Sequence, residues 1–192
     1  MKPNHANIAV VIATYNGEQF LREQLNSVLA QTLMPSEIII QDDNSSDGTW
    51  ALLQEYQQRY PYLIRLYKNE KGIGAHANFR KAFKYVTADY IAPCDQDDIW
   101  MPEKLERSYN ALRDSNCSLV ACKEVILYED GSKVPNFYPM PSIEDCIFNH
   151  GVAGHLMMIH REAIEVFDIA DRITFDFGLT VYSACKGGGA SG

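Results

Sequence analysis

The chain has 192 residues and a formal net charge of −8, with 46% hydrophobic and 22% charged residues. These values are typical of a globular protein with a core, and the acidic charge without any Lys/Arg-rich block argues against a nucleic-acid partner. The five cysteines show no C-x-x-C spacing. That pattern argues against a disulfide framework or a zinc site and favours a reducing compartment.

The N-terminal residues, MKPNHANIAVVIATY, lack the long apolar core of a signal peptide. No apolar run approaches the roughly 18 residues of a membrane span. We therefore expect a cytoplasmic protein with no membrane span of its own. Peripheral association with the inner face of the plasma membrane stays open as an alternative.

Buried strands and amphipathic helices alternate along the first 115 residues. Continuous apolar runs predict strands at residues 8–13, 37–41, 62–67 and 90–94. Apolar residues at helical spacing predict helices at residues 18–29, 50–60 and 102–115. Another helix is predicted to start in the segment 71–78 and to end at residue 86. This alternation is typical of βαβ units with right-handed crossovers and predicts an α/β fold with a mainly parallel sheet.

Polar loops follow three of these strands, at residues 14–17, 42–47 and 95–98. Ligands of parallel α/β sheets bind beyond the carboxyl ends of the strands, so we expect the three loops to converge on one binding site. The last loop, DQDD, has three aspartates in four positions, which repel one another unless a cation neutralises them. Oxygen ligands of this kind suit Mg²⁺ or Mn²⁺. The alternative is a solvated acidic turn whose aspartates cap the next helix.

The alternation stops after Ser118. A strand is predicted over residues 119–128, with a hairpin-like turn at 129–132, and another strand over 156–159. Residues 135–145 and 148–154 are expected to form irregular loops, and residues 161–167 a short helix. His155 and His160 flank the second strand and are candidates for contact with an acceptor.

Three strings occur in order along the chain: IATYNGEQFLREQLNSVLAQT, EIIIQDDNSSDGTW and DYIAPCDQDDIWMPEKLE. Together they resemble the inverting glycosyltransferase family 2, whose fold is GT-A, a Rossmann-like mainly parallel sheet flanked by helices. The DQDDIW form is similar in particular to the bacterial rhamnosyltransferase-like branch, which builds surface polysaccharides. The resemblance is close over about residues 7–115 and weaker over 154–180.

The resemblance implies a single GT-A domain over residues 1–185. Its nucleotide-sugar-binding half spans 7–115 and its acceptor-side half spans 116–185. Because 192 residues is short for this family, we expect the acceptor side to be truncated. The last residues, 186–192 (KGGGASG), have the composition of a flexible tail.

The resemblance also implies which residues bind the nucleotide. Ala13, Thr14 and Tyr15 match the turn that packs around the base. Asp43 matches the carboxylate that accepts a hydrogen bond from the ring N–H of uracil or thymine, with Asp42 as the alternative. A UDP- or dTDP-linked donor is therefore expected.

The D-x-D motif of the family is matched by Asp95 and Asp97. The resemblance places Asp95 near the ribose and the metal, Gln96 at the donor, and Asp97 on a Mg²⁺ or Mn²⁺ ion that bridges the donor's diphosphate. His76 lies where many relatives have an arginine, in a segment that ends at Asn78, and both are expected at the donor. Because His76 replaces that arginine, a permanently charged side chain near the diphosphate is either missing or replaced by a titratable one.

Asp176 matches the carboxylate that serves as the catalytic base. The whole pattern implies a metal-dependent inverting glycosyltransferase of the hexosyltransferase type, which moves a sugar to a hydroxyl of a glycan or lipid-linked glycan. The product would be a bacterial surface polysaccharide, such as lipopolysaccharide, O-antigen or capsule.

Two other functions stay open: a sugar-nucleotide-binding module that is inactive through truncation, and a nucleotidyltransferase. A nucleotidyltransferase usually has Lys or Arg in its first loop, and ATYNGEQF has none. A dinucleotide-binding domain is disfavoured because G-x-G-x-x-G is absent after the first strand.

Overall fold

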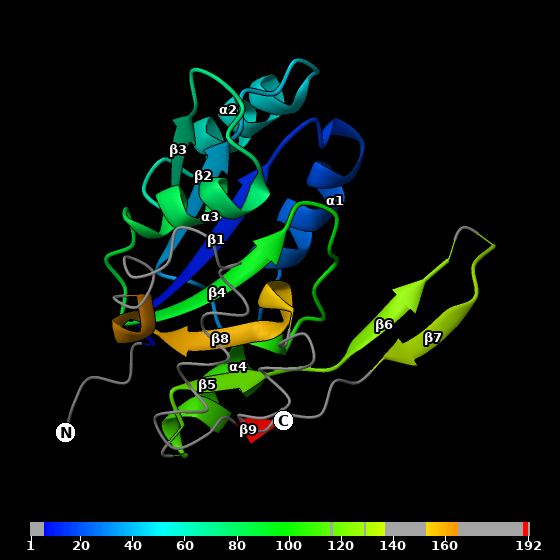
Figure 1. Ribbon diagram of the computed structural model, residues 1–192. Helices are drawn as coiled ribbons and strands as arrows, with labels where there is room; N and C mark the ends of the chain where they lie inside the picture. The colour runs from blue at the N-terminus through cyan, green and yellow to red at the C-terminus, as the bar shows by residue number, and fades with distance from the viewer. Residues whose placement is uncertain (1–5, 116, 129, 137–152, 165–189, 192) are drawn as a thin grey trace.

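The computed structural model describes residues 6–115, 117–128, 130–136, 153–164 and 190–191. Its main sheet has seven strands in the order β3-β2-β1-β4-β8-β5-β9, and β6 and β7 form a separate two-stranded ribbon (Figure 1). The helices and strands are, in chain order, β1 (Ile8–Thr14), α1 (Glu18–Leu29), β2 (Glu37–Asp42), α2 (Thr49–Arg59), β3 (Ile64–Lys68), α3 (Ala75–Phe83), β4 (Tyr90–Asp95), α4 (Lys104–Arg113), β5 (Leu119–Ala121), β6 (Glu124–Leu127), β7 (Lys133–Asn136), η1 (Gly154–Leu156), β8 (Met157–His160) and β9 (Ala190–Ser191).

The first four strands pair in parallel around β1, which is hydrogen-bonded to β2 on one side and to β4 on the other. β3 extends the sheet beyond β2, also in parallel. β8 then pairs antiparallel with both β4 and β5. The predicted alternation of strands and helices and the mainly parallel sheet are thus confirmed.

The central strands are buried and mainly apolar because helices cover both faces of the sheet. Successive side chains of β1 point to opposite faces. Ile8, Val10 and Ile12 join a core cluster with buried side chains of α1, α2 and α4, whereas Ala9 and Val11 join a second cluster with buried side chains of α3. The result is three layers, helix, sheet and helix, with no polar face on the central strands.

The acceptor-side half differs from its predicted elements. The predicted strand over 119–128 is divided, because β5 ends at Ala121 and β6 starts at Glu124 and leaves the sheet. β6 and β7 form an antiparallel hairpin that extends away from the main sheet (Figure 1). Both parts of the segment are apolar, but the side chains of β5 are buried and those of β6 mostly exposed, so composition alone did not separate them.

Smaller differences occur elsewhere. β7 includes Pro135 and Asn136, where a loop was predicted, and residues 161–164 form a 3₁₀ turn in the first part of the predicted short helix. In the expected flexible tail, Ala190 and Ser191 form β9, paired in parallel with β5. An edge strand offers unpaired backbone groups that favour such pairing. No helix of the described part of the chain has both the length and the apolarity needed to cross a membrane.

A buried carboxylate joins the start of β2 to the chain that enters β4. The Oε1 atom of Glu37 accepts the backbone N–H groups of Thr87 (2.7 Å) and Ala88 (2.8 Å), and its Oε2 atom accepts the Thr87 hydroxyl (3.0 Å) and pairs with Arg65. Glu37 is only 8% exposed. Its loss would leave the buried N–H of Ala88 without its acceptor and Arg65 without its carboxylate partner.

We expect Glu37→Ala to lower the free energy of unfolding by about 2–4 kcal/mol, because the groups that are hydrogen-bonded to a largely buried carboxylate lose their acceptor. Chemical denaturation of the two proteins measures this difference. Glu55→Ala is the matched control, since Glu55 pairs only with exposed arginines and should change the value by less than about 1 kcal/mol. Equal effects of the two substitutions would contradict the role assigned to Glu37.

Candidate functional site

The carboxyl ends of β1, β2 and β4 meet at one edge of the sheet. The last paired residues are Thr14 with Asp42 and Ala13 with Asp95, so the three polar loops leave the sheet side by side. The predicted convergence is confirmed. A cavity of about 470 Å³ lies there, lined by Ala13, Thr14, Tyr15, Asp43, Gly72, Gly74, Ala75, Asn78, Phe79, Asp95, Gln96 and Asp97.

Most of the residues predicted to bind the donor or its metal therefore line one cavity. His76 is the exception: its side chain is exposed in the first turn of α3, and among the described residues the neighbouring Ala75 and Asn78 line the cavity instead. Asp176, the predicted catalytic base, lies outside the described residues. The binding roles of all these residues stay predictions.

Asp43 is 5% exposed and is held by three donors of the protein. Its Oδ1 atom accepts Asn69 Nδ2 (2.7 Å), its Oδ2 atom accepts the N–H of Gly74 (2.8 Å), and the N–H of Ile73 is shared between Oδ1 (2.9 Å) and Oδ2 (3.0 Å). The carboxylate of Asp43 lines the cavity while both of its oxygens accept hydrogen bonds from the protein. Asp43 thus fixes the 72–74 loop, whose Gly74 has φ +87°, against the cavity.

Asn69, which donates to Asp43, belongs to a buried network of side-chain amides. Its Nδ2 group also donates to Asn78 Oδ1 (2.8 Å), and its Oδ1 atom accepts Gln41 Nε2 (3.1 Å) and Lys81 Nζ (2.7 Å). Asn78 in turn donates to the backbone carbonyl of Gln41 (2.7 Å). The side chain of Asn78 is thus part of the cavity wall, and its predicted contact with the donor stays a prediction.

Asp42 plays a structural part in the neighbouring loop. It is fully buried and accepts the Thr14 hydroxyl (3.1 Å), together with the hydroxyl (2.6 Å) and the backbone N–H (2.9 Å) of Ser45. Asn44 has φ 64°, a left-handed conformation that asparagine tolerates. Since Asp43, and not Asp42, lines the cavity, Asp43 is the better candidate of the two for base recognition.

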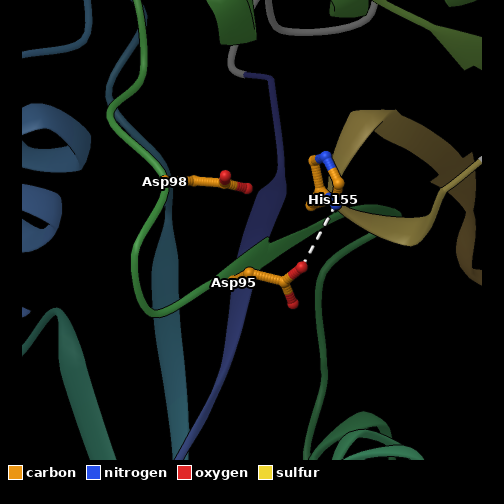
Figure 2. A group of neighbouring side chains, drawn as sticks. All are labelled: Asp95, Asp98 and His155. Atoms are coloured by element: carbon orange, nitrogen blue, oxygen red, sulfur yellow. Dashed lines mark ion pairs between the residues drawn. The ribbon is translucent and has the colours of Figure 1, made fainter. Parts of the chain in front are cut away.

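The DQDD loop contributes to two adjacent groups of side chains. Asp97 is exposed and lines the cavity together with Asp95. Asp95 and Asp98 also lie near His155, with one ligand atom from each residue all within 4.8 Å of one another (Figure 2). His155 comes from η1, in the acceptor-side half, and its Nδ1 atom is 3.1 Å from Asp95 Oδ2. Asp95 therefore belongs to both groups.

His155 is a cation in this arrangement. Burial would lower the pKa of its imidazole, but the hydrogen bond to Asp95, the charge of Asp98 and the hydrogen bond to Glu124 raise the pKa to about 9. Its Nε2 atom lies 3.0 Å from Glu124 Oε2, so both ring nitrogens face carboxylates and both are donors. Lys104 adds a second cation nearby, since its Nζ group donates to the backbone carbonyl of His155 (2.7 Å).

Asp98 completes this group from a partly buried position. Burial raises the pKa of its carboxyl, and its Oδ2 atom is buried with no hydrogen-bond partner in the described part of the chain. A buried carboxylate oxygen without a donor is costly unless a cation lies nearby, and here the imidazolium of His155 supplies that charge. The carboxylate oxygens of Asp95 and Asp97 in the cavity are the donor set that fits a hard divalent ion.

Sequence reasoning missed Asp98, Glu124 and Lys104 as members of the site. The third aspartate of DQDD was a signal for Asp98. His155 was predicted as an acceptor contact, but its position beside Asp95 depends on the antiparallel pairing of β8 with β4. No local pattern reveals that pairing.

The sequence of this chain matches a known protein family. The family model described as "Glycosyl transferase family 2" matches residues 9–167. The chain belongs to this family.

Curated bacterial relatives carry related descriptions. The dTDP-rhamnosyl transferase RfbG of Shigella flexneri is 36% identical over 126 residues, which cover 64% of this chain and 44% of RfbG. WfgD of Escherichia coli, described as a UDP-Glc:alpha-D-GlcNAc-diphosphoundecaprenol beta-1,3-glucosyltransferase, is 33% identical over 113 residues, which cover 59% of this chain and 44% of WfgD. The chain spans less than half the length of each of these two relatives.

Solved structures resemble the fold at low sequence identity. TarS 1-349 of S. aureus in complex with UDP-GlcNAc matches with a TM-score of 0.77 at 19% identity, covering 96% of this chain and 55% of that one. The mannosyltransferase PcManGT of Pyrobaculum calidifontis, in complex with GDP-Man and Mn²⁺, matches with a TM-score of 0.74 at 18% identity, covering 97% and 54%. These matches confirm the predicted GT-A fold.

We expect Asp43→Ala to release the 72–74 loop, because the backbone N–H groups of Ile73 and Gly74 lose their acceptor. Amide hydrogen exchange at these two residues should become faster, and the free energy of unfolding should fall by about 1–3 kcal/mol. Asp114→Ala is the control, since Asp114 is exposed at the end of α4. Unchanged exchange at Ile73 and Gly74 would show that the loop is held by other contacts.

Proposed function

We propose that this protein is a metal-dependent inverting glycosyltransferase that transfers a sugar from a UDP- or dTDP-linked donor to a hydroxyl group. The acceptor would be a glycan or lipid-linked glycan in the synthesis of a bacterial surface polysaccharide. The observation that carries the proposal is the cavity itself, in which Tyr15 and Asp43 lie with the carboxylates of Asp95 and Asp97. RfbG and WfgD, by their descriptions, use dTDP-linked and UDP-linked donors.

The nucleotide end of the donor would lie between Tyr15 and Asp43. The exposed Tyr15 offers an aromatic surface at the cavity, and Asp43 offers carboxylate oxygens, which accept hydrogen bonds and do not donate them when ionised. Uracil and thymine present the same ring N–H. This part of the site therefore favours both nucleotides over bases that offer an acceptor there.

Asp95 and Asp97 would hold the metal ion, because both line the cavity and carboxylate oxygens are the ligands that Mg²⁺ and Mn²⁺ prefer. When bound there, a divalent ion supplies Lewis-acid stabilisation of the negative charge on the departing diphosphate. His155 and Lys104 balance the charge of the neighbouring Asp98 and Glu124. They leave the cavity-facing carboxylates as the acidic surface that meets the donor.

Asp176 would take the proton from the acceptor hydroxyl as that oxygen attacks the anomeric carbon. Attack from the face opposite the leaving diphosphate inverts the configuration and needs one base and no covalent enzyme intermediate. The lipid-linked acceptor of WfgD supports an acceptor of that class here. A lipid-linked acceptor also supports peripheral association of this protein with the inner face of the plasma membrane. The described residues contain no helix that could cross the membrane.

We expect calorimetric titration to show binding of UDP or dTDP in the presence of Mn²⁺ or Mg²⁺ and loss of most of that binding in EDTA. Asp97→Ala should weaken the metal-supported affinity by at least about tenfold, as expected for a metal ligand. The isosteric Asp98→Asn should leave most of it intact, because Asp98 faces His155 and does not line the cavity.

Two results would contradict the proposal in different ways. A folded wild-type protein that binds neither nucleotide with metal present would overturn the glycosyltransferase function. Loss of binding in Asp98→Asn with retention in Asp97→Ala would move the metal to the Asp95, Asp98 and His155 group.

Asp176→Asn should lower turnover by roughly 10²–10⁴-fold while donor binding stays at the wild-type level, because general-base assistance contributes that much to the rate. Release of UDP from UDP-glucose and UDP-N-acetylglucosamine measures turnover, and calorimetry measures binding. Asp171→Asn, five residues earlier, is the control. NMR of the first sugar released should show the β anomer from an α-linked donor. Donor binding without any turnover in the wild type would favour an inactive binding module.

A further inference from the structure

Gln96, the middle residue of the D-x-D motif, is bound to the turn after β1. Its Oε1 atom accepts the backbone N–H of Tyr15 (2.9 Å), and its Nε2 group donates to the backbone carbonyl of the same residue (3.1 Å). The amide of Gln96 thus pairs with both backbone groups of Tyr15, as a neighbouring strand would. Its oxygen and one N–H of its amide group thus bind the protein, and its predicted contact with the donor stays a prediction.

The Gln96 amide lies close to Gly17. A Cβ atom added at Gly17 would lie 2.3 Å from Gln96 Oε1 and 2.6 Å from its Cδ. The backbone of Gly17 itself does not require glycine, since its φ is −105°. A side chain at position 17 would therefore displace the Gln96 amide from its contact with Tyr15.

The other side of the turn is anchored to the loop after β2. Asn16 donates its backbone N–H to Ser45 Oγ (2.9 Å), and Gly17 donates its backbone N–H to Thr49 Oγ1 (2.8 Å). Within the part of the chain that the structure describes, the Gln96 amide is the hydrogen-bonded link between residues 15–17 and the D-x-D loop. The turn and the loop are therefore joined through one side chain.

This link connects the two ends of the cavity. Tyr15 lines the end assigned to the base, and the carboxylates of Asp95 and Asp97 flank Gln96 at the end assigned to the metal and diphosphate. A ligand that orders either end restrains the other through the Gln96 amide. Coupling of this kind is reciprocal, so each half of the ligand raises the affinity for the other by the same factor.

We propose that Gln96 is a positioning residue that couples the metal-binding carboxylates to the base-binding turn, so that metal and nucleotide bind cooperatively. This inference rests on the proposed function. Gln96 acts through Tyr15, and Gly17 leaves the space that this contact needs.

The test is the gain in UDP affinity that Mn²⁺ provides, measured by calorimetry with Mn²⁺ and with EDTA. In Gln96→Ala this gain should fall by roughly 3–10-fold relative to the wild type, a modest coupling because the contact is partly exposed. Gly17→Ala should lower it similarly, because the new methyl group displaces the Gln96 amide without changing it. Gln54→Ala, on the exposed face of α2, is the control and should keep the wild-type gain.

A purely structural role of Gln96 predicts a different result. It would lower the affinity for UDP equally with Mn²⁺ and with EDTA, together with the melting temperature, and leave the gain unchanged. An unchanged gain in Gln96→Ala would overturn the coupling while the donor-binding function stands.

Hydrogen exchange at the Tyr15 amide tests the contact without any nucleotide. Exchange should be faster in Gln96→Ala and Gly17→Ala than in the wild type and the Gln54→Ala control. If the wild type bound neither UDP nor dTDP, the proposed function would fall and this measurement would still decide the contact. Equal exchange rates at the Tyr15 amide in all four proteins would overturn the contact between Gln96 and Tyr15.

Discussion

The parallel pairing of β1 with both β2 and β4 is the constraint on which the rest of the structure depends. Both pairings run to the carboxyl ends of the strands, where Ala13 lies opposite Asp95 and Thr14 opposite Asp42. Every polar group of the cavity leaves the sheet from this line or is held by a side chain that does. The parallel sheet places these ends at one edge, and hydrogen bonds to the side chains of Asp42, Asp43 and Gln96 then hold the loops that follow the strands.

The charges of the site are balanced between the two halves of the chain. The N-terminal half of the chain brings Asp95, Asp97 and Asp98 together, which alone would repel one another. The C-terminal half supplies His155, whose imidazolium lies between Asp95 and Glu124. Asp97 lines the cavity, whereas Asp95 both lines the cavity and pairs with His155. The ion pair between His155 and Asp95 also joins the C-terminal half to the end of β4.

The sequence alone predicted the part of the fold that depends on local pattern. Apolar runs bounded by polar loops identified β1, β2 and β4 because these strands are buried on both faces, and the rule for parallel sheets then placed Asp43, Asp95 and Asp97 at one edge. Contacts between distant segments were not predictable in this way. The insertion of β8 between β4 and β5, the departure of β6 from the sheet and the grip of Asp43 on residues 72–74 all depend on tertiary pairing. The composition of one segment does not show which distant segment it pairs with.

The contact between Gln96 and the turn after β1 has an evolutionary consequence. The side chain at position 96 fills the volume that a Cβ atom at position 17 would need. A side chain at position 17 therefore displaces the Gln96 amide, so substitutions at the two positions are coupled although they lie far apart in the chain. A relative without a glycine at position 17 needs a shorter residue at position 96 or another partner for the Tyr15 backbone.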